Sequence, residues 1–240
     1  MNPFDQHEFD IRLEWGIKGV EMLAPISDVI IIVDVLSFST SVDVAISQGA
    51  VVYPYRYRDD SSKSYAAQMG ALLAGGRREG DSVYSLSPAS LLSLHSGTQL
   101  VLPSPNGSTL SLATGDTKTI CGCLRNAKAV ADAAMRMGRK ISIIPAGEIW
   151  PDSSLRPALE DMIGAGAIIS YLKGRLSPES IAALSVFNDC KDIYEQISRS
   201  SSGKELIAMG FEEDVRIASK YNVSDSLPVL LKGAYTKLIS

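Results

Sequence analysis

Asp34 is the residue of this chain that most directly suggests chemistry, because it follows a continuous apolar run over residues 29–33. A carboxylate removed from water needs hydrogen bonds, a cation or an open edge of the fold to offset the cost of desolvation. Mg²⁺ prefers carboxylate oxygens and often keeps water and phosphate as its other ligands. The same carboxylate could instead cap a helix that begins after it. Asp34 therefore predicts either a metal ligand or a helix cap, and both readings stay open.

A second group of residues lies where a short apolar segment at 99–102 gives way to a helix-like pattern. Asn106, Gly107 and Ser108 make up this turn. Glycine lets the backbone approach a ligand closely, and the first amides of a helix favour an anion. The same residues are also ordinary turn formers. The turn therefore predicts a phosphate-binding loop, or only a tight connection.

Arg125 and Asn126 precede a further candidate helix over 127–137. A guanidinium can hold phosphate through two parallel hydrogen bonds, so Arg125 is a candidate for binding the substrate and assisting catalysis. A surface arginine without such a role is the alternative.

Glu160 and Asp161 form an acidic pair on the helix expected over 157–172. Adjacent acids on a helix usually face water. The small residues at 164–166 would, however, let this helix pack close to the sheet near its first turn. The pair predicts a second metal ligand if the start of the helix is buried, and a solvated face if it is not.

The elements that must position these side chains alternate between strands and helices. Expected strands cover 29–33, 51–57, 99–102, 119–121, 141–144 and 229–231, and expected helices cover 39–48, 59–73, 108–113, 127–137, 157–172, 181–187, 205–209 and 212–220. This alternation predicts an α/β fold with three α/β/α layers around a largely parallel or mixed sheet, formed as one domain by residues 1–240. Pro54 suggests that its strand lies at a sheet edge or a bulge.

Loops that leave the carboxyl ends of parallel strands share one edge of the sheet, where ligands bind. The expected topology brings a set of polar residues to this edge, namely Asp34, Ser104, Asn106, Arg125, Asn126 and Glu148. Residues that are far apart in the sequence thus become candidates for one site.

The composition excludes several classes of protein. A net charge of -4 offers no basic face for a polyanion, so no nucleic-acid partner is expected. The longest apolar run is too short to cross a bilayer, and the first residues lack the pattern of a signal peptide. Three cysteines do not make a disulfide framework, and two histidines rule out a histidine-based metal cluster. We therefore expect a cytoplasmic protein without a membrane partner; the sequence leaves a homodimer open.

Taken together, these segments resemble the 2-phosphosulfolactate phosphatase family of the coenzyme M pathway. The family signature begins with a strand ending in Asp-Val and continues through an Asn-Gly-Thr turn, an Asn-Ala helix start, an Ala-Gly loop and a Glu-Asp helix with Ala-Gly. The matching positions, in the same order, are Asp34-Val35, Asn106-Gly107-Ser108, Asn126-Ala127, Ala146-Gly147 and Glu160-Asp161 with Ala165-Gly166, followed by 202–206, 210–211 and 214–215.

The resemblance implies a Mg²⁺-dependent phosphatase that hydrolyses a small phosphorylated hydroxy acid, as in the conversion of 2-phosphosulfolactate to sulfolactate and phosphate. Asp34 would be the principal metal ligand, with Glu160 or Asp161 as the second. The residues expected to hold the substrate are Asn106, Gly107, Ser108, Asn126 and Gly147, with Arg77, Arg78 and Arg125 neutralising its charge.

One departure from the family pattern lies in the turn after the first strand, where the family carries arginine and this chain has Ser37. Serine lacks both the charge and the paired donors of a guanidinium. Arg77, Arg78 or Arg125 would have to supply them from another loop. The departure motivates an alternative function, a non-catalytic relative that binds a small anion.

Overall fold

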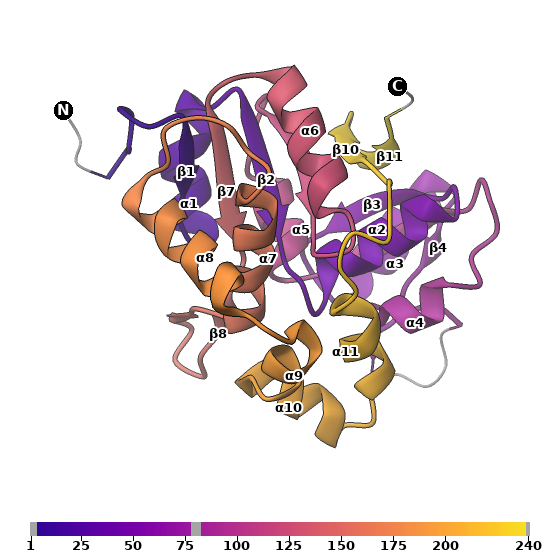
Figure 1. Cartoon of the computed structure of the whole chain (residues 1–240). Helices are drawn as coiled ribbons and strands as arrows, with labels where there is room; N and C mark the ends of the chain where they lie inside the picture. The colour runs from indigo at the N-terminus through magenta and orange to yellow at the C-terminus, as the bar shows by residue number, and fades with distance from the viewer. Residues whose placement is uncertain (1–3, 78–82, 239–240) are drawn as a thin grey trace.

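The computed structural model describes residues 4–77 and 83–238, and Figure 1 traces the chain. The strands are β1 (Ile11–Leu13), β2 (Val29–Val33), β3 (Val51–Tyr55), β4 (Leu72–Leu73), β5 (Gln99–Pro103), β6 (Lys118–Gly122), β7 (Ile141–Pro145), β8 (Glu148–Ile149), β9 (Leu155–Arg156), β10 (Pro228–Leu231) and β11 (Ala234–Lys237). The helices are α1 (Gly16–Leu23), α2 (Phe38–Ser47), α3 (Asp60–Met69), α4 (Pro88–Leu91), α5 (Gly107–Ser111), α6 (Ala127–Met137), α7 (Leu159–Ile169), α8 (Pro178–Asp189), α9 (Ile193–Ser198), α10 (Ser201–Ala208) and α11 (Glu212–Ala218).

Within the described residues, nine strands form one mixed sheet in the order β1-β7-β2-β6-β10-β11-β3-β5-β4. Neighbours among β1, β7, β2 and β6 are parallel, as are neighbours among β3, β5 and β4. The antiparallel hairpin β10–β11 joins the two groups by pairing with β6 on one side and β3 on the other. Helices cover both faces of the sheet, which confirms the predicted α/β class, its three layers and its mixed sheet (Figure 1).

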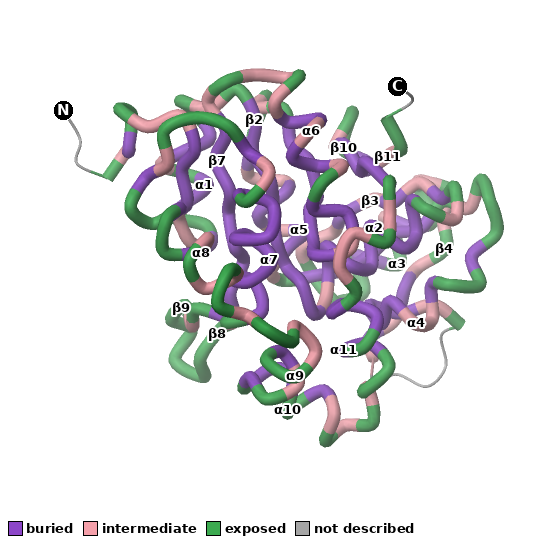
Figure 2. The backbone as a smooth tube through the Cα atoms, viewed as in Figure 1, coloured by how far each residue is buried: buried purple, intermediate pink, exposed green. Residues whose placement is uncertain are grey.

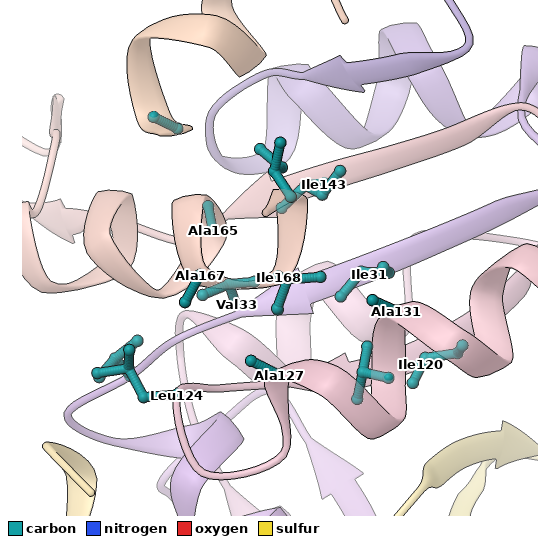
Figure 3. Packing of buried hydrophobic residues seen from close by; sticks show 14 of the residues in the cluster. Ile31, Val33, Ile120, Leu124, Ala127, Ala131, Ile143, Ala165, Ala167 and Ile168 are labelled. Atoms are coloured by element: carbon teal, nitrogen blue, oxygen red, sulfur yellow. The ribbon is translucent and has the colours of Figure 1, made fainter. Parts of the chain in front are cut away.

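β2 shows how the sequence builds these layers. The strand has the predicted bounds, is β-branched throughout and is buried at every position. Successive side chains of a strand point to opposite faces of the sheet. Ile31 and Val33 accordingly join a core cluster with α6 and α7, whereas Ile30 and Ile32 join another with α1 and α5. Figure 3 shows the first cluster, with Ile168 of α7 close to Ile31 and Val33.

Two glycines let α7 pack closely against its neighbours. A Cβ atom added to Gly164 would lie 2.5 Å from Val35 Cγ2, so α7 approaches the end of β2 as predicted. A Cβ atom added to Gly166 would overlap the carbonyl oxygen of Ala183, so this glycine faces α8 instead. The close approach to the sheet buries the acidic first turn of α7.

The predicted helix over 59–73 is wrong at its carboxyl end. α3 ends at Met69, and Gly70 follows in a left-handed conformation with a φ of 61°. Glycine is favoured at this position after a helix because it has no Cβ atom to clash. The chain then extends into β4, an edge strand that pairs with β5.

The predicted edge position of Pro54 is also wrong, since β3 lies between β11 and β5. β3 pairs with β11 only at Val52, which lies opposite Tyr235. The missing amide of Pro54 therefore falls where this ladder has already ended, which is how an interior strand tolerates proline.

Several short elements lie outside the sequence predictions, among them β1, α1, α9, the β8–β9 hairpin and β11. β11 is the most consequential because it completes the hairpin in the middle of the sheet. Its turn uses Lys232 and Gly233, both with positive φ, and Tyr235 of β11 is fully buried against Phe38 at a ring distance of 5.9 Å. Figure 2 shows the buried centre of the sheet and the exposed outer surfaces of the helices around it. No helix among residues 4–77 and 83–238 is long and apolar enough to cross a membrane.

Candidate active site

A pocket of about 480 Å³ lies where the loops after β2, β5 and β7 meet helix α10. The described residues that line it are Asp34, Leu36, Ser37, Arg58, Arg77, Leu86, Ser104, Pro105, Asn106, Glu148, Ile149, Ser202, Glu205, Leu206 and Met209. Of the residues expected at one sheet edge, Asp34, Ser104, Asn106 and Glu148 do meet there.

Asp34 is buried at the floor of this pocket, where it accepts hydrogen bonds from two helix starts. Oδ1 accepts from the Phe38 amide at 3.2 Å, and Oδ2 accepts from the Gly107 amide at 3.1 Å. Burial raises the pKa of Asp34 to about 6, against the lowering effect of these amides. Asp34 is therefore a helix cap, as one of the two readings predicted, and each of its oxygens keeps a further lone pair for a ligand.

Asp161 holds two loops of the site together. Its Oδ1 atom accepts from the Val35 amide at 2.7 Å, and its Oδ2 atom accepts from the Gly147 amide at 2.9 Å. Burial, followed by the nearby charges of Asp34 and Glu160, raises the pKa of Asp161 well above its ordinary value. The contacts make Asp161 a tie between the β2 and β7 loops.

Glu160 is only 2% exposed, and its Oε2 atom has no hydrogen-bond partner in the described part of the chain. This burial excludes the solvated helix face that the acidic pair could have formed. The negative charge of Glu160 raises the pKa values of Asp34, Asp161 and Glu148, so the four acids share one electrostatic environment. A buried carboxylate oxygen without a partner is costly. A hard divalent cation would compensate it, so the donor set fits Mg²⁺.

Glu148 lines the pocket and is held there by a side-chain contact that the sequence did not predict. Asn106 Nδ2 donates to Glu148 Oε2 at 3.1 Å and to the carbonyl oxygen of Gly147 at 3.2 Å. Burial and the nearby charge of Asp34 raise the pKa of Glu148 to about 7. Topology alone placed Glu148 at this edge, and its contact with Asn106 could not be read from the sequence.

The four acids do not form a ready-made metal cage. A preformed metal site would bring the ligand atoms of at least three acidic, histidine or cysteine side chains within 4.8 Å of one another. Among residues 4–77 and 83–238, this is the case only for Asp5, His7 and Glu8, near the N-terminus. Mg²⁺ commonly takes one or two carboxylates and completes its shell with water and substrate phosphate. The arrangement thus fits an ion that substrate and water help to hold.

Arg77 brings a positive charge to the place where this chain has Ser37. Its Nη1 atom donates to Ser37 Oγ at 3.2 Å, Nη2 donates to the carbonyl oxygen of Leu36 at 2.5 Å, and Nε donates to Asp214 Oδ2 at 3.0 Å. Of the three arginines considered from the sequence, Arg77 is the one that the described structure places at the pocket. Arg78 lies outside the described residues.

Arg125 and Asn126 are not among the described residues that line the pocket. Arg125 Nε donates to Asp43 Oδ2 at 2.7 Å, which turns the guanidinium toward α2. The Asn126 side chain accepts from the Cys123 amide and donates to the carbonyl oxygens of Cys121 and Ser226. These contacts explain both residues as supports of the loop after β6.

The turn before α5 is also occupied by contacts within the protein. The Gly107 amide binds Asp34, and Ser108 Oγ donates to the carbonyl oxygen of Leu102. A Cβ atom on residue 107 would overlap the Phe38 ring, so glycine is needed for close packing. Of the predicted phosphate loop, Asn106 is the residue that reaches the pocket.

The wall formed by α10 was not predicted from individual residues. Ser202, Glu205, Leu206 and Met209 line the pocket from this side, and Arg156 Nη2 donates to Ser202 Oγ at 3.1 Å. The only sequence signal for this wall was the ordered match of 202–206 to the family signature.

Known proteins resemble this chain over most of its length. A family model described as 2-phosphosulpholactate phosphatase matches residues 20–233. A 2-phosphosulfolactate phosphatase of Methanothermobacter thermautotrophicus is 28% identical over 209 residues, which cover 86% of this chain and 88% of the relative. A probable 2-phosphosulfolactate phosphatase of Carboxydothermus hydrogenoformans is 33% identical over 209 residues, with coverages of 83% and 84%. The chain therefore belongs to the 2-phosphosulfolactate phosphatase family.

Proposed function

We propose that this protein is a Mg²⁺-dependent phosphatase that acts on a small phosphorylated hydroxy acid of the 2-phosphosulfolactate type. Family membership and the names of the relatives support the reaction. One observation supports the proposed metal: the Glu160 Oε2 atom is buried, lacks a hydrogen-bond partner in the described structure and lies near other acids.

The charges of the pocket also favour a cation. A phosphomonoester brings close to two negative charges into a pocket whose described lining includes the carboxylates of Asp34 and Glu148. The arginines among the described lining residues are Arg58 and Arg77, and the charge of Arg77 is partly offset by its ion pair with Asp214. When ionised, these acids repel the phosphate group of the substrate. A divalent ion removes this repulsion.

Asp34 would hold the ion at the pocket, with Glu148 as a further carboxylate of the lining. Glu160 lies near Asp34 but is not among the described lining residues, and it would offer its unpartnered Oε2 atom. A bound Mg²⁺ ion would supply a Lewis acid for the phosphoryl oxygen and lower the pKa of a water molecule. Burial raises the pKa of Glu148 to about 7 in the metal-free protein, and a bound cation would lower it again, so Glu148 would be ionised when the metal is present.

The remaining residues bind and orient. Arg77 donates to the phosphoryl oxygens, where charge develops during transfer. Asn106 fixes the Glu148 carboxylate through the hydrogen bond of 3.1 Å. Asp161 holds the Gly147 loop through its amide at 2.9 Å. Helix α10 forms the opposite wall and limits the space available to the alcohol part of the substrate.

The alternative function, anion binding without catalysis, was motivated by Ser37. Arg77 weakens this argument for the alternative function, because its guanidinium reaches the same turn from another loop and contacts Ser37 and the carbonyl oxygen of Leu36. The charge missing from the turn is thus available in the same pocket. Catalysis is the function that the pocket supports best.

The direct test is release of phosphate from a panel of small phosphomonoesters, including 2-phosphosulfolactate and phospholactate, before and after divalent metal is removed with EDTA. We expect hydrolysis that requires Mg²⁺, and a fall in kcat/KM of about 10²-fold or more for Asp34→Asn, because the metal loses its principal ligand. Asp60→Asn is a matched control: Asp60 is an exposed acid whose ion pair with Lys63 contributes little. Hydrolysis that survives both EDTA and Asp34→Asn would overturn the proposal.

A further inference from the structure

Asp214, in the first turn of α11, is a buried carboxylate outside the set of acids described above. It accepts hydrogen bonds from three groups: Arg77 Nε at 3.0 Å, Ser87 Oγ at 2.5 Å and the Ala89 amide at 3.2 Å. The last two belong to the start of α4. Asp214 is not among the described residues that line the pocket, so any effect on a ligand must pass through a neighbour.

Arg77 is that neighbour. A guanidinium has five N–H donors in a fixed plane. Three donors are used within the described protein, by Asp214 at Nε, by Ser37 at Nη1 and by Leu36 at Nη2. One N–H remains on each terminal nitrogen of an arginine that lines the pocket. The plane of the group is fixed from its Nε side by Asp214, and the Phe211 ring lies 5.9 Å from Cζ.

We infer that Asp214 is the positioning residue that aims Arg77 at the phosphate group of the substrate. A carboxylate suits this role better than a neutral side chain, because a charged acceptor binds the guanidinium more strongly and holds its plane. Ser87 and the Ala89 amide hold the carboxylate in turn. The identity of the ligand rests on the proposed function. The coupling between Asp214 and Arg77 rests only on the contacts described above.

The chain contains a matched control pair. Arg125 Nε donates to Asp43 Oδ2 at 2.7 Å, and Asp43 Oδ1 accepts from Ser224 Oγ at 2.7 Å. The arginine side chains of both pairs are 12% exposed, and the carboxylates of Asp214 and Asp43 are 1% and 0% exposed. Asp43→Asn therefore makes the same chemical change in the same degree of burial, away from the pocket.

The experiment measures the dissociation constant of inorganic phosphate by calorimetry in the presence of Mg²⁺, together with kcat and KM for the best phosphomonoester. Asp214→Asn should weaken phosphate binding about 10-fold and raise KM, whereas Asp43→Asn should change both by less than about twofold. Arg77→Ala combined with Asp214→Asn should match Arg77→Ala alone within about twofold, because Asp214 acts only through Arg77.

Among the variants, three results would overturn the inference: wild-type phosphate binding in Asp214→Asn, equal losses in the two aspartate variants, or losses that multiply in the double variant. If Asp214→Asn does not fold, Ser87→Ala removes one of the three donors to Asp214 and should weaken phosphate binding about threefold; unchanged binding in Ser87→Ala would then count against the inference. A wild type that binds phosphate but hydrolyses no phosphomonoester would refute the proposed function only, and the phosphate constants would still decide the inference. Absence of phosphate binding by the wild type would overturn the inference itself.

Discussion

Two buried arginine–aspartate pairs in this chain have nearly the same geometry but different surroundings. The nitrogen–oxygen distance is 3.0 Å in Arg77–Asp214 and 2.7 Å in Arg125–Asp43, and both arginines are equally buried. Arg77 lines the pocket, whereas Arg125 does not. Burial of the side chain and pairing with an aspartate are therefore not enough to identify an arginine that a ligand can reach. What distinguishes the two in the described structure is that Arg77 lines a pocket that a ligand could enter.

Each pair also joins distant parts of the chain. Arg125 and Asp43, together with Ser224, connect the loop after β6, helix α2 and the segment that leads to β10. Arg77 and Asp214 connect the segment after β4 with α11, and through Ser87 with α4. Both pairs tie the C-terminal part of the chain to earlier elements. We therefore expect equal roles in folding and unequal roles in function.

The largest expected effect separates the two arginines by activity. Arg77→Ala should lower kcat/KM by about 10²- to 10³-fold, because a charge-assisted contact to the transferring phosphoryl group is lost. Arg125→Ala should lower it by less than about threefold, since its guanidinium is directed at α2. Steady-state kinetics on the best phosphomonoester checks both values.

Comparable losses in the two arginine variants would break this comparison, because they would mean that Arg125 reaches the substrate or that both changes act through the fold. Thermal midpoints measured on the same samples separate these explanations. Arg125→Lys, which keeps the charge and loses the planar donors, is the matched control for the loop after β6.

The second prediction concerns stability, where the pairs should behave alike. Asp214→Ala and Asp43→Ala each leave a buried guanidinium without its carboxylate, so each should lower the free energy of unfolding by roughly 3 kcal/mol. Urea denaturation followed by circular dichroism measures this. If only Asp43→Ala is destabilising, the Arg77 pair contributes to binding without holding the fold, and the comparison becomes sharper.

The sequence was sufficient for elements whose local pattern is decisive. β2 and α6 have the predicted bounds, because a buried β-branched run and an alanine-rich amphipathic segment leave few alternatives. Topology also brought Asp34, Asn106 and Glu148 to one edge of the sheet. α3, which ends at Met69, shows the limit of prediction from local sequence, since Gly70 in a left-handed conformation outweighed the helix propensities of the residues after it.

The rest of the site depends on tertiary docking that no local pattern encodes. Arg77 and Asp214 are 137 positions apart and meet only because α11 packs beside α4. The Gly107 amide looked free for phosphate, yet the chain brings it to Asp34, 73 positions away. Hydrogen bonds of this kind are determined by how the helices pack against the sheet and against one another. A sequence can therefore predict candidate donors and acceptors, but not which of them remain free to bind a ligand in the folded protein.

The smallest expected effect is a pH dependence of stability caused by the buried acids. Burial raises the pKa of Asp34 to about 6 and that of Glu148 to about 7, and it also raises the pKa values of Asp161 and of Asp43, the latter despite its ion pair with Arg125. Groups with raised pKa values bind more protons in the folded state than in the unfolded state. The free energy of unfolding of the metal-free protein should therefore fall as the pH rises from about 4 to about 7.

Urea denaturation in EDTA across this pH range tests the expected slope in the wild type and in Glu148→Gln. The substitution should remove the part of the slope that lies between the ordinary pKa of glutamate, 4.5, and about 7. Added Mg²⁺ should stabilise the wild type most at the upper end of the range, because ionised carboxylates bind the ion and only the folded state assembles them. An identical slope in Glu148→Gln would show that the pKa of Glu148 is the same in the folded and unfolded states, and the slope would then have to come from the other buried acids, Asp34, Asp161 and Asp43.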